Sequence, residues 1–337
     1  MAAARKEQVA RQLAARAPEP ADSGRNPGTP LELGWIREVR VNRSAIERRA
    51  AAIGTRRTVA NEWQAAWLLR VVTLIDLTTL AGDDTPGRVR QLCATARRPV
   101  RDDLLEELGV AHLGIRVAAV CVYHPFVETA LAALRGSGIP VAAVSAGFPS
   151  GLTPFPQRLA EIRASLAAGA EEIDVVITRA HVLTGNWQAL YDEVRAFRET
   201  CGDAHLKVIL ATGELGTLHN VARASRVAMM AGADFIKTST GKEAVNATLP
   251  VGLVMARAIR DYYERTGYRV GLKPAGGIRT ARQALEWLFL AKEELGDEWL
   301  RPQLFRFGAS GLLADIERQL EHHRPGRDSA AHRRPLV

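Results

Sequence analysis

The 337 residues predict an α/β fold, a TIM (β/α)8 barrel with an N-terminal helical extension. Short apolar runs alternate with amphipathic stretches eight times between residues 70 and 322, which is typical of βα units in a parallel sheet. A doubly wound sheet is the alternative fold, but such a sheet usually carries G-x-G-x-x-G after an early strand, and this chain has none there. Hydrophobic residues make up 47% of the chain, enough for one large core.

The expected strands are short runs rich in Val, Ile and Leu, and each is followed by a stretch with helical periodicity. The strands are expected at 71–77, 117–123, 141–146, 172–178, 206–211, 235–239, 270–273 and 304–307. The helices are expected at 86–97, 126–134, 157–168, 187–199, 218–230, 250–263, 281–294 and 312–320. In a barrel of this kind the active site lies at the C-terminal ends of the strands.

Three further segments flank the expected barrel, which spans 70–322. Residues 1–34 contain four prolines among Gly and Ser, which favours a disordered tail. Residues 35–69 are rich in Ala, Arg and Leu, and we expect helices that pack outside the barrel. Residues 323–337 again read as a flexible tail.

The overall charge permits attraction to phosphorylated ligands, because 45 Lys and Arg exceed 37 Asp and Glu. Nucleic acid is not an expected partner, since only 6% of residues are aromatic and no basic run is interleaved with aromatics. The three cysteines are odd in number and lack C-x-x-C spacing, which fits reduced thiols in the cytoplasm. No signal-peptide core or membrane-spanning apolar stretch is present, so we expect no membrane partner.

Two lysines stand inside apolar strands, Lys237 in one and Lys273 in the next. Strand alternation can point both into the barrel, and neighbouring strands lie only about 4.8 Å apart. A nearby cation and partial burial both favour the neutral amine, the form that attacks a carbonyl. A pair of surface lysines is the alternative, disfavoured by the apolar and glycine-rich flanks.

Asp174 is a carboxylate in the middle of another apolar strand, where leaving it unpaired would be costly. One interpretation is a structural salt bridge that balances a buried cation. The other is a functional pair with Lys273 that moves protons through water. The sequence leaves both open.

Three glycine-rich loops after the last strands are typical of a phosphate site, because glycines let backbone N–H groups approach an anion. The candidate substrate-binding residues in these loops are Thr240, Gly241, Lys242, Gly276, Gly277, Gly308 and Ser310. A nucleotide P-loop is excluded, since Glu243 stands where Ser or Thr would bind magnesium. No H-x-H or H-E-x-x-H spacing occurs, and we expect no metal and no other cofactor.

Several segments in the same order resemble the deoxyribose-phosphate aldolase family, and in particular its longer, animal-type branch. They are DLTTLAGDDT, EEIDVVI, KVILATGEL, ADFIKTSTGK, GLKPAGGIRT and LFRFGASGLL, and the resemblance runs from Trp35 to His322. It implies a class I aldolase on a TIM barrel, which cleaves 2-deoxyribose 5-phosphate to glyceraldehyde 3-phosphate and acetaldehyde in deoxyribonucleoside breakdown. It also leaves a homo-oligomer open.

The resemblance also assigns roles to residues. It makes Lys237 the Schiff-base lysine, Lys273 a neighbour that perturbs its pKa and moves protons, and Asp174 a second proton carrier. Asp76 matches a family motif at the mouth of the active site, and we expect it to bind substrate in a supporting hydrogen-bonding role. The chain departs from many bacterial members in having Ser310-Gly311 instead of two serines, and its carboxyl-terminal tail has no tyrosine. Two other functions stay open: a Schiff-base aldolase or transaldolase for another sugar phosphate, and a barrel that binds RNA or protein through its arginine-rich extensions.

Overall fold

The computed structural model of the chain describes residues 24–56 and 59–323. The strands are β1 Ile75–Thr78, β2 Ala119–Tyr123, β3 Val141–Ser145, β4 Glu172–Val176, β5 His205–Ile209, β6 Phe235–Lys237, β7 Gly271–Lys273 and β8 Phe307–Ala309. The helices are α2 Leu33–Arg37, α3 Arg43–Arg56, α4 Asn61–Val72, α5 Pro86–Arg97, α6 Asp102–Glu107, α7 Val127–Leu134, α8 Phe155–Ala167, α9 Arg179–Leu183, α10 Trp187–Cys201, α11 Leu218–Met230, α12 Leu249–Thr266, α13 Ala281–Leu295 and α14 Leu312–Glu321. Short 3-10 turns complete the set.

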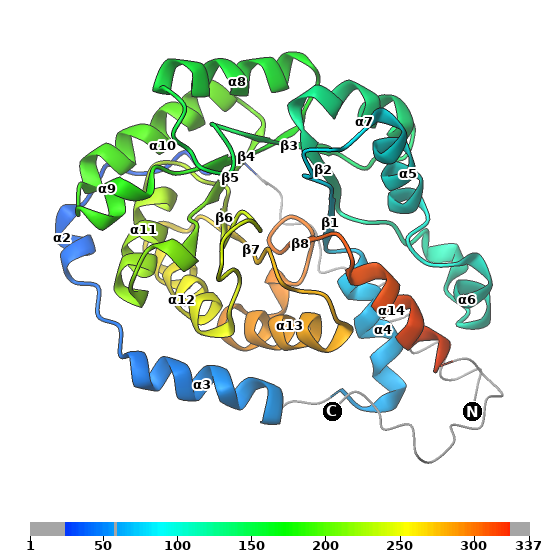
Figure 1. Cartoon of the computed structure of the whole chain (residues 1–337). Coiled ribbons are helices and arrows are strands. Elements are labelled where there is room, and N and C mark those ends of the chain that lie inside the picture. The colour runs from blue at the N-terminus through cyan, green and yellow to red at the C-terminus, as the bar shows by residue number, and fades with distance from the viewer. Residues whose placement is uncertain (1–23, 57–58, 324–337) are drawn as a thin grey trace.

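The eight described strands are parallel and lie side by side in the order β7-β6-β5-β4-β3-β2-β1-β8. Strands β7 and β8 meet through parallel bridges, one from Leu272 to Phe305 and one from Ala275 to Gly308, so the sheet closes on itself. Figure 1 shows the strands in the centre with the helices around them. The prediction of a TIM barrel is confirmed.

Local sequence sets several helix ends. Helices α5 and α11 match their expected ranges residue for residue, because Thr85 and Thr217 each accept a backbone N–H three residues on, which caps the helix start. The observed strands differ from the predicted ranges by one or more residues at their ends, and the largest differences are at the first and last strands. Val71 and Val72 belong to α4, whose helical pattern continues past 69. The last strand begins at Phe307, because the residues before it form only an isolated bridge, from Phe305 to Leu272 of β7.

The prediction of a disordered tail as far as residue 34 is wrong for residues 24–34. Asn26 is buried, and its side chain donates to the carbonyls of Met229 and Ala233 at 2.8 and 2.9 Å. Its backbone N–H donates to Asp234, the residue before β6, and it accepts a hydrogen bond from Tyr262. These hydrogen bonds fix the segment in place, although its proline and glycine content is typical of a disordered tail. The rest of that expected tail and residues 324–337 lie outside the described residues.

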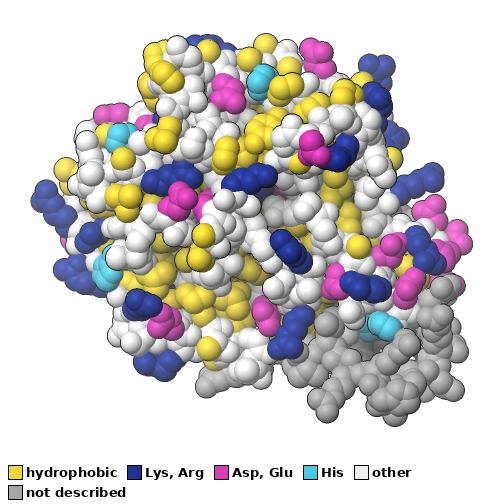
Figure 2. Space-filling view, in the orientation of Figure 1, with side chains coloured by type: hydrophobic (Ala, Val, Ile, Leu, Met, Phe, Trp, Pro, Cys, Tyr) yellow, Lys and Arg dark blue, Asp and Glu magenta, His cyan; other side chains and the backbone are white. Residues whose placement is uncertain are grey.

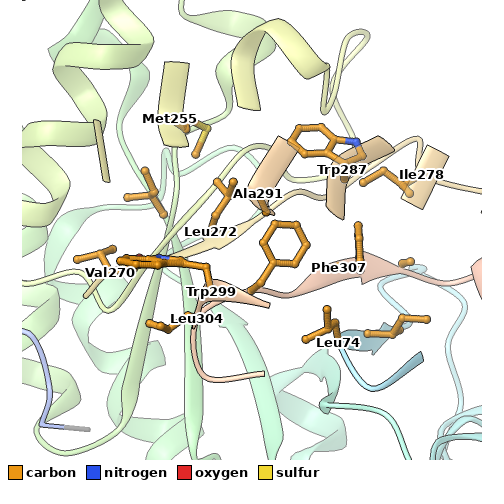
Figure 3. Packing of buried hydrophobic residues seen from close by; sticks show 14 of the residues in the cluster. Leu74, Met255, Val270, Leu272, Ile278, Trp287, Ala291, Trp299, Leu304 and Phe307 are labelled. Atoms are coloured by element: carbon orange, nitrogen blue, oxygen red, sulfur yellow. The ribbon is translucent and has the colours of Figure 1, made fainter. Parts of the chain in front are cut away.

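Beyond this segment, α3 lies outside the barrel along α12 and α13, and α4 packs beside α13 and α14 (Figure 1). The main core fills the layer between the strands and the helices that surround them. Figure 3 shows part of it, where Trp299 donates its indole N–H to the carbonyl of Val270 at 3.0 Å. Leu272 packs in this layer, so the alternate residues of β7 face the barrel interior.

The surface and thiols bear on the class of protein. On the face shown in Figure 2, Lys and Arg side chains are spread out with Asp and Glu between them, and they form no single basic field. Cys93, Cys121 and Cys201 are buried free thiols. Among the described residues, no helix is long and apolar enough to cross a bilayer. The cytoplasmic location stays a prediction.

Candidate active site

Seven charged residues bring their side chains together inside the barrel, and none of these residues is more than 4% exposed. They are Asp76 of β1, Glu172 and Asp174 of β4, Lys207 of β5, Lys237 of β6, Lys273 of β7 and Arg306 just before β8. Charged residues are rarely buried so completely unless they are paired.

Strand register brings the two sequence-predicted lysines together. Lys237 and Lys273 are paired residues of β6 and β7, and Asp174 is paired with Lys207 across β4 and β5. Below the lysines, Phe235 fills the space at Gly271, where an added Cβ would lie 2.3 Å from the phenyl ring. An apolar floor therefore supports the charged groups.

Asp174 is the centre of the lysine cluster. Its Oδ2 accepts from the Nζ of Lys237 at 2.8 Å and from the Nζ of Lys273 at 2.7 Å. Its Oδ1 accepts from the Nζ of Lys207 at 3.0 Å. One buried carboxylate thus contacts three lysines.

The remaining contacts close a ring. Lys273 Nζ lies 2.5 Å from Asp76 Oδ2, and Asp76 Oδ1 lies 2.5 Å from Arg306. Arg306 also contacts Glu172 Oε1 at 2.9 Å, and Glu172 Oε2 lies 2.5 Å from Lys207 Nζ. With Asp174 between Lys207 and Lys273, six alternating charges form a closed circuit, which we call the ionic ring.

The lysines of the site differ in how their environment acts on them. Burial is the main cause that lowers the pKa of Lys237, and the charge of Lys273 lowers it further, against the opposing effect of Asp174. Burial acts in the same direction on Lys273, but the carboxylates of Asp174 and Asp76 outweigh it and raise its pKa. The carboxylates of Asp174 and Glu172 likewise raise the pKa of Lys207. Lys237 is therefore the lysine best suited to be a neutral amine.

Part of the interior wall next to the charged groups is apolar. A separate buried cluster consists of Cys121, Ala142, Val144, Phe148, Val176 and Ile209. Burial raises the pKa of the Cys121 thiol, which keeps it neutral at this wall. Such a surface accommodates a carbon chain without competing for the neighbouring polar groups.

The three predicted phosphate loops meet at the mouth of the barrel. A Cβ at Gly241 would lie 4.0 Å from Gly276, and a Cβ at Gly308 would lie 2.8 Å from that of Ala275. Gly241, Gly276 and Gly277 all have positive φ, between 82° and 84°, which favours glycine. The side chain of Lys242 is exposed, and so are Gly277 and Ser310.

Thr240 is arranged differently from its prediction as a ligand. It is buried, and both its N–H and its hydroxyl donate to Glu243 Oε1 at 2.7 Å, so these donors already have an acceptor. The hydroxyl in turn accepts from the backbone N–H of Lys242 at 3.0 Å. The side chain of Glu243 thus shapes the first loop, whereas the sequence had shown only that it rules out a P-loop.

Sequence reasoning missed Glu172, Lys207 and Arg306. Glu172 stands two residues before Asp174, a spacing that places both on one face of a strand, so alternation alone could have found it. Among the described residues, no group of three or more His, Cys, Asp or Glu is arranged to hold a metal ion.

Comparisons with known proteins identify the family of the chain. A family model described as DeoC/LacD family aldolase matches residues 70–317. The deoxyribose-phosphate aldolase of Homo sapiens is 61% identical over 316 residues, covering 93% of this chain and 99% of the human protein. That of Mus musculus is 62% identical over 311 residues, covering 92% and 98%.

Two solved structures share the fold. One from Toxoplasma gondii has a TM-score of 0.67 at 22% identity, covering 78% of this chain and 97% of the other. The deoxyribose phosphate aldolase from Aeropyrum pernix has a TM-score of 0.58 at 22% identity, covering 82% and 98%. At that identity these two support the barrel alone. The family model and the mammalian relatives go further: the chain belongs to the DeoC/LacD family of aldolases, enzymes of the lyase class.

Proposed function

We propose that the protein reversibly cleaves 2-deoxy-D-ribose 5-phosphate to D-glyceraldehyde 3-phosphate and acetaldehyde through an imine on Lys237. The observation that carries this proposal is a buried lysine with a lowered pKa, hydrogen-bonded at 2.8 Å to a carboxylate that two further lysines share. The mammalian relatives, named deoxyribose-phosphate aldolases, support the choice of substrate.

The neutral amine of Lys237 attacks C1 of the open-chain aldehyde and forms a carbinolamine, which loses water to give a protonated imine. The positive nitrogen draws the electron pair of the C2–C3 bond. The C3 hydroxyl loses its proton and becomes the aldehyde of glyceraldehyde 3-phosphate. The remaining enamine is protonated at C2, and water releases acetaldehyde from the lysine.

Asp174 and Lys273 are the groups we propose to move protons in these steps. They contact each other at 2.7 Å, and Asp174 also contacts the reacting amine. A carboxylate and an ammonium in contact can hand a proton to bound water and take one back. Asp76, 2.5 Å from Lys273, holds that ammonium in place.

The phosphate of the substrate is proposed to bind where the loops after β6, β7 and β8 meet. Lys242 offers an exposed ammonium, and Gly277 and Ser310 are exposed on the neighbouring loops. Backbone N–H groups at such glycines, with the start of α14 close behind Ser310, suit an anion. Gly241, Gly276 and Gly308 allow these backbones to approach one another.

The test is chemical trapping. Incubation with acetaldehyde and borohydride should leave a reduced two-carbon adduct on Lys237, because hydride traps only an imine. Mass mapping of the adduct to Lys207 or Lys273 would reject the assignment. Product analysis with 2-deoxyribose 5-phosphate, beside a panel of other sugar phosphates, then separates the proposed substrate from that of another Schiff-base aldolase.

The proposed reaction places the enzyme in the breakdown of deoxyribonucleosides, in the cytoplasm. Three free thiols support a reducing compartment. The structure from Aeropyrum pernix is described as tetrameric, and we propose a homo-oligomer here as well. Light scattering of the purified full chain would measure its mass in solution.

A further inference from the structure

The positive and negative charges of the ionic ring balance without Lys237. Its positive members are Lys273, Arg306 and Lys207, and its negative members are Asp76, Glu172 and Asp174. Each member contacts an opposite charge on either side at distances between 2.5 and 3.0 Å, and Lys207 also lies 3.7 Å from Asp76 across the ring. Three positive and three negative charges give a net charge of zero.

Lys237 lies outside this circuit and contacts it at one atom, Asp174 Oδ2. That atom is already bound by Lys273, so Lys237 has no carboxylate of its own among the described residues. A protonated Lys237 would be a fourth cation beside three anions, almost fully buried. An uncompensated buried charge is costly, and loss of a proton from the amine removes that cost.

Among the described residues, no other charged side chain around the site pairs with Lys237. Strand β2 contributes Cys121, a neutral buried thiol, and β3 contributes only Ala142 and Val144 to this wall. Strand β5 contributes His205, whose Nδ1 lies 3.5 Å from Glu172 Oε1 and whose side chain is 21% exposed. It lies at the Glu172 side of the ring rather than beside Lys237.

We propose that Arg306, Glu172 and Lys207 are positioning residues for the aldol reaction, which act by closing a neutral ring and so leave Lys237 as the one uncompensated amine. This inference rests on the proposed imine at Lys237. Within the described structure none of the three hydrogen-bonds or ion-pairs with Lys237, so each acts on it through the charges of the ring.

The ring predicts the sign of each effect. Removal of a positive member leaves one excess negative charge. Because an amine is more basic than a carboxylate, Lys237 takes up the balancing proton first, and its reactivity begins at higher pH. Removal of the negative member Glu172 leaves an excess positive charge, and Lys237 loses its proton at lower pH.

The experiment measures imine formation across a pH series in the full chain. Acetaldehyde and cyanoborohydride are added, and the adduct on Lys237 is quantified by mass mapping. Arg306→Met and Lys207→Met should move the midpoint of adduct formation up, and Glu172→Gln should move it down. Each shift should be about one to two pH units, the size expected for a unit charge within about 10 Å at an effective dielectric constant of about 20, and Lys207, which shares Asp174 with Lys237, should give the larger shift of the two cations.

Two controls separate charge from packing. Arg306→Lys keeps the positive charge but loses the forked contact with two carboxylates, so its midpoint should stay near that of the unmodified enzyme. Glu193→Gln breaks a buried ion pair outside the barrel and should not move the midpoint.

The proposal is supported if the midpoint of adduct formation moves up in Arg306→Met and Lys207→Met and down in Glu172→Gln. Equal midpoints, or shifts in one direction for all variants, would overturn it. If Arg306→Met loses its far-ultraviolet dichroism, the comparison of Lys207→Met with Glu172→Gln decides the sign. An unmodified enzyme that forms no adduct on Lys237 would instead reject the proposed function, and the two failures are distinguishable.

Discussion

Two buried ionic systems stand on opposite sides of the same strands. The ionic ring lies inside the barrel, and the pair Arg158 and Glu193 joins α8 to α10 outside it at 2.6 Å. The residues of the outer pair are 3% and 5% exposed, so burial alone does not separate it from the ring. The difference lies in what each system binds.

The outer pair binds backbone. Arg158 donates to the carbonyls of Ala146 and Val176 at 3.0 and 2.8 Å, and Glu193 accepts from the N–H of Thr178 at 2.9 Å. These contacts hold the ends of β3 and β4, including Ala146, whose φ of 65° is unusual for a residue with a side chain. The positive charge of Arg158 balances the negative charge of Glu193, and the pair has no additional amine. The ring contacts mostly side chains and has Lys237 beside it in excess.

This comparison teaches that an excess of charge, rather than burial, marks the reactive group. A balanced buried pair with backbone partners stabilises the fold, and removal of either partner is costly. A balanced ring with a surplus cation changes the protonation of that cation. Substitutions that break one ionic system at a time test this difference.

The largest effect is expected from Lys273→Leu. It removes a proposed proton carrier, so kcat should fall by about 10²–10⁴, the usual worth of a positioned acid or base. It also leaves the ring with an excess negative charge, so the pKa of Lys237 should rise and the acidic limb of the pH–rate profile should move to higher pH. Steady-state kinetics across a pH series measures both.

Lys273→Arg is the matched control. A guanidinium stays protonated, so it keeps the charge but cannot carry protons. We expect activity to remain low with the acidic limb close to its original position. If the acidic limb of the Lys273→Leu profile is unchanged, the charge of Lys273 does not control the pKa of Lys237.

A smaller effect, on stability, is expected from Arg158→Met. It leaves Glu193 buried without its cation, and the free energy of unfolding should fall by about 3–5 kcal/mol. The midpoint of imine formation should not move, because the ring is intact. Urea unfolding measures the fall in the free energy of unfolding. Arg43→Met is the control: it breaks the exposed pair with Glu47 and should leave that free energy unchanged. A shifted midpoint would mean that the outer pair also controls the amine.

The parts predictable from sequence were those with a local signal. Alternating apolar runs predicted the barrel, and helical periodicity predicted the ranges of α5 and α11, whose starts the structure shows to be capped by Thr85 and Thr217. Lys237, Lys273 and Asp174 stood out because each is a charge within an apolar run. These features need no knowledge of distant residues.

The rest depends on contacts between distant parts of the chain. Asp76 and Arg306 are 230 residues apart, and neither residue alone indicates a ring. Lys207 lies within its expected strand, but its carboxylate partners Glu172 and Asp174 are 35 and 33 residues away, so its own surroundings did not indicate a ring. Residues 24–34 looked like a tail because their prolines are visible in the sequence, whereas the partners of Asn26 are 203 to 236 residues away.

The smallest predicted effect tests the mouth of the barrel, remote from both ionic systems. Lys242→Ala should raise the Michaelis constant for 2-deoxyribose 5-phosphate by about tenfold to a hundredfold, since a charge-assisted contact is worth about 1.5–3 kcal/mol. The exposed ammonium of Lys242 would meet the phosphate and not the reacting carbonyl, so unphosphorylated deoxyribose should be little affected. Ser310→Ala is the milder control, because it removes one hydroxyl and keeps the backbone donor. Equal losses on both sugars would instead mean that Lys242 acts through its loop, in which its N–H binds Thr240 and Thr240 binds Glu243, and that the phosphate lies elsewhere.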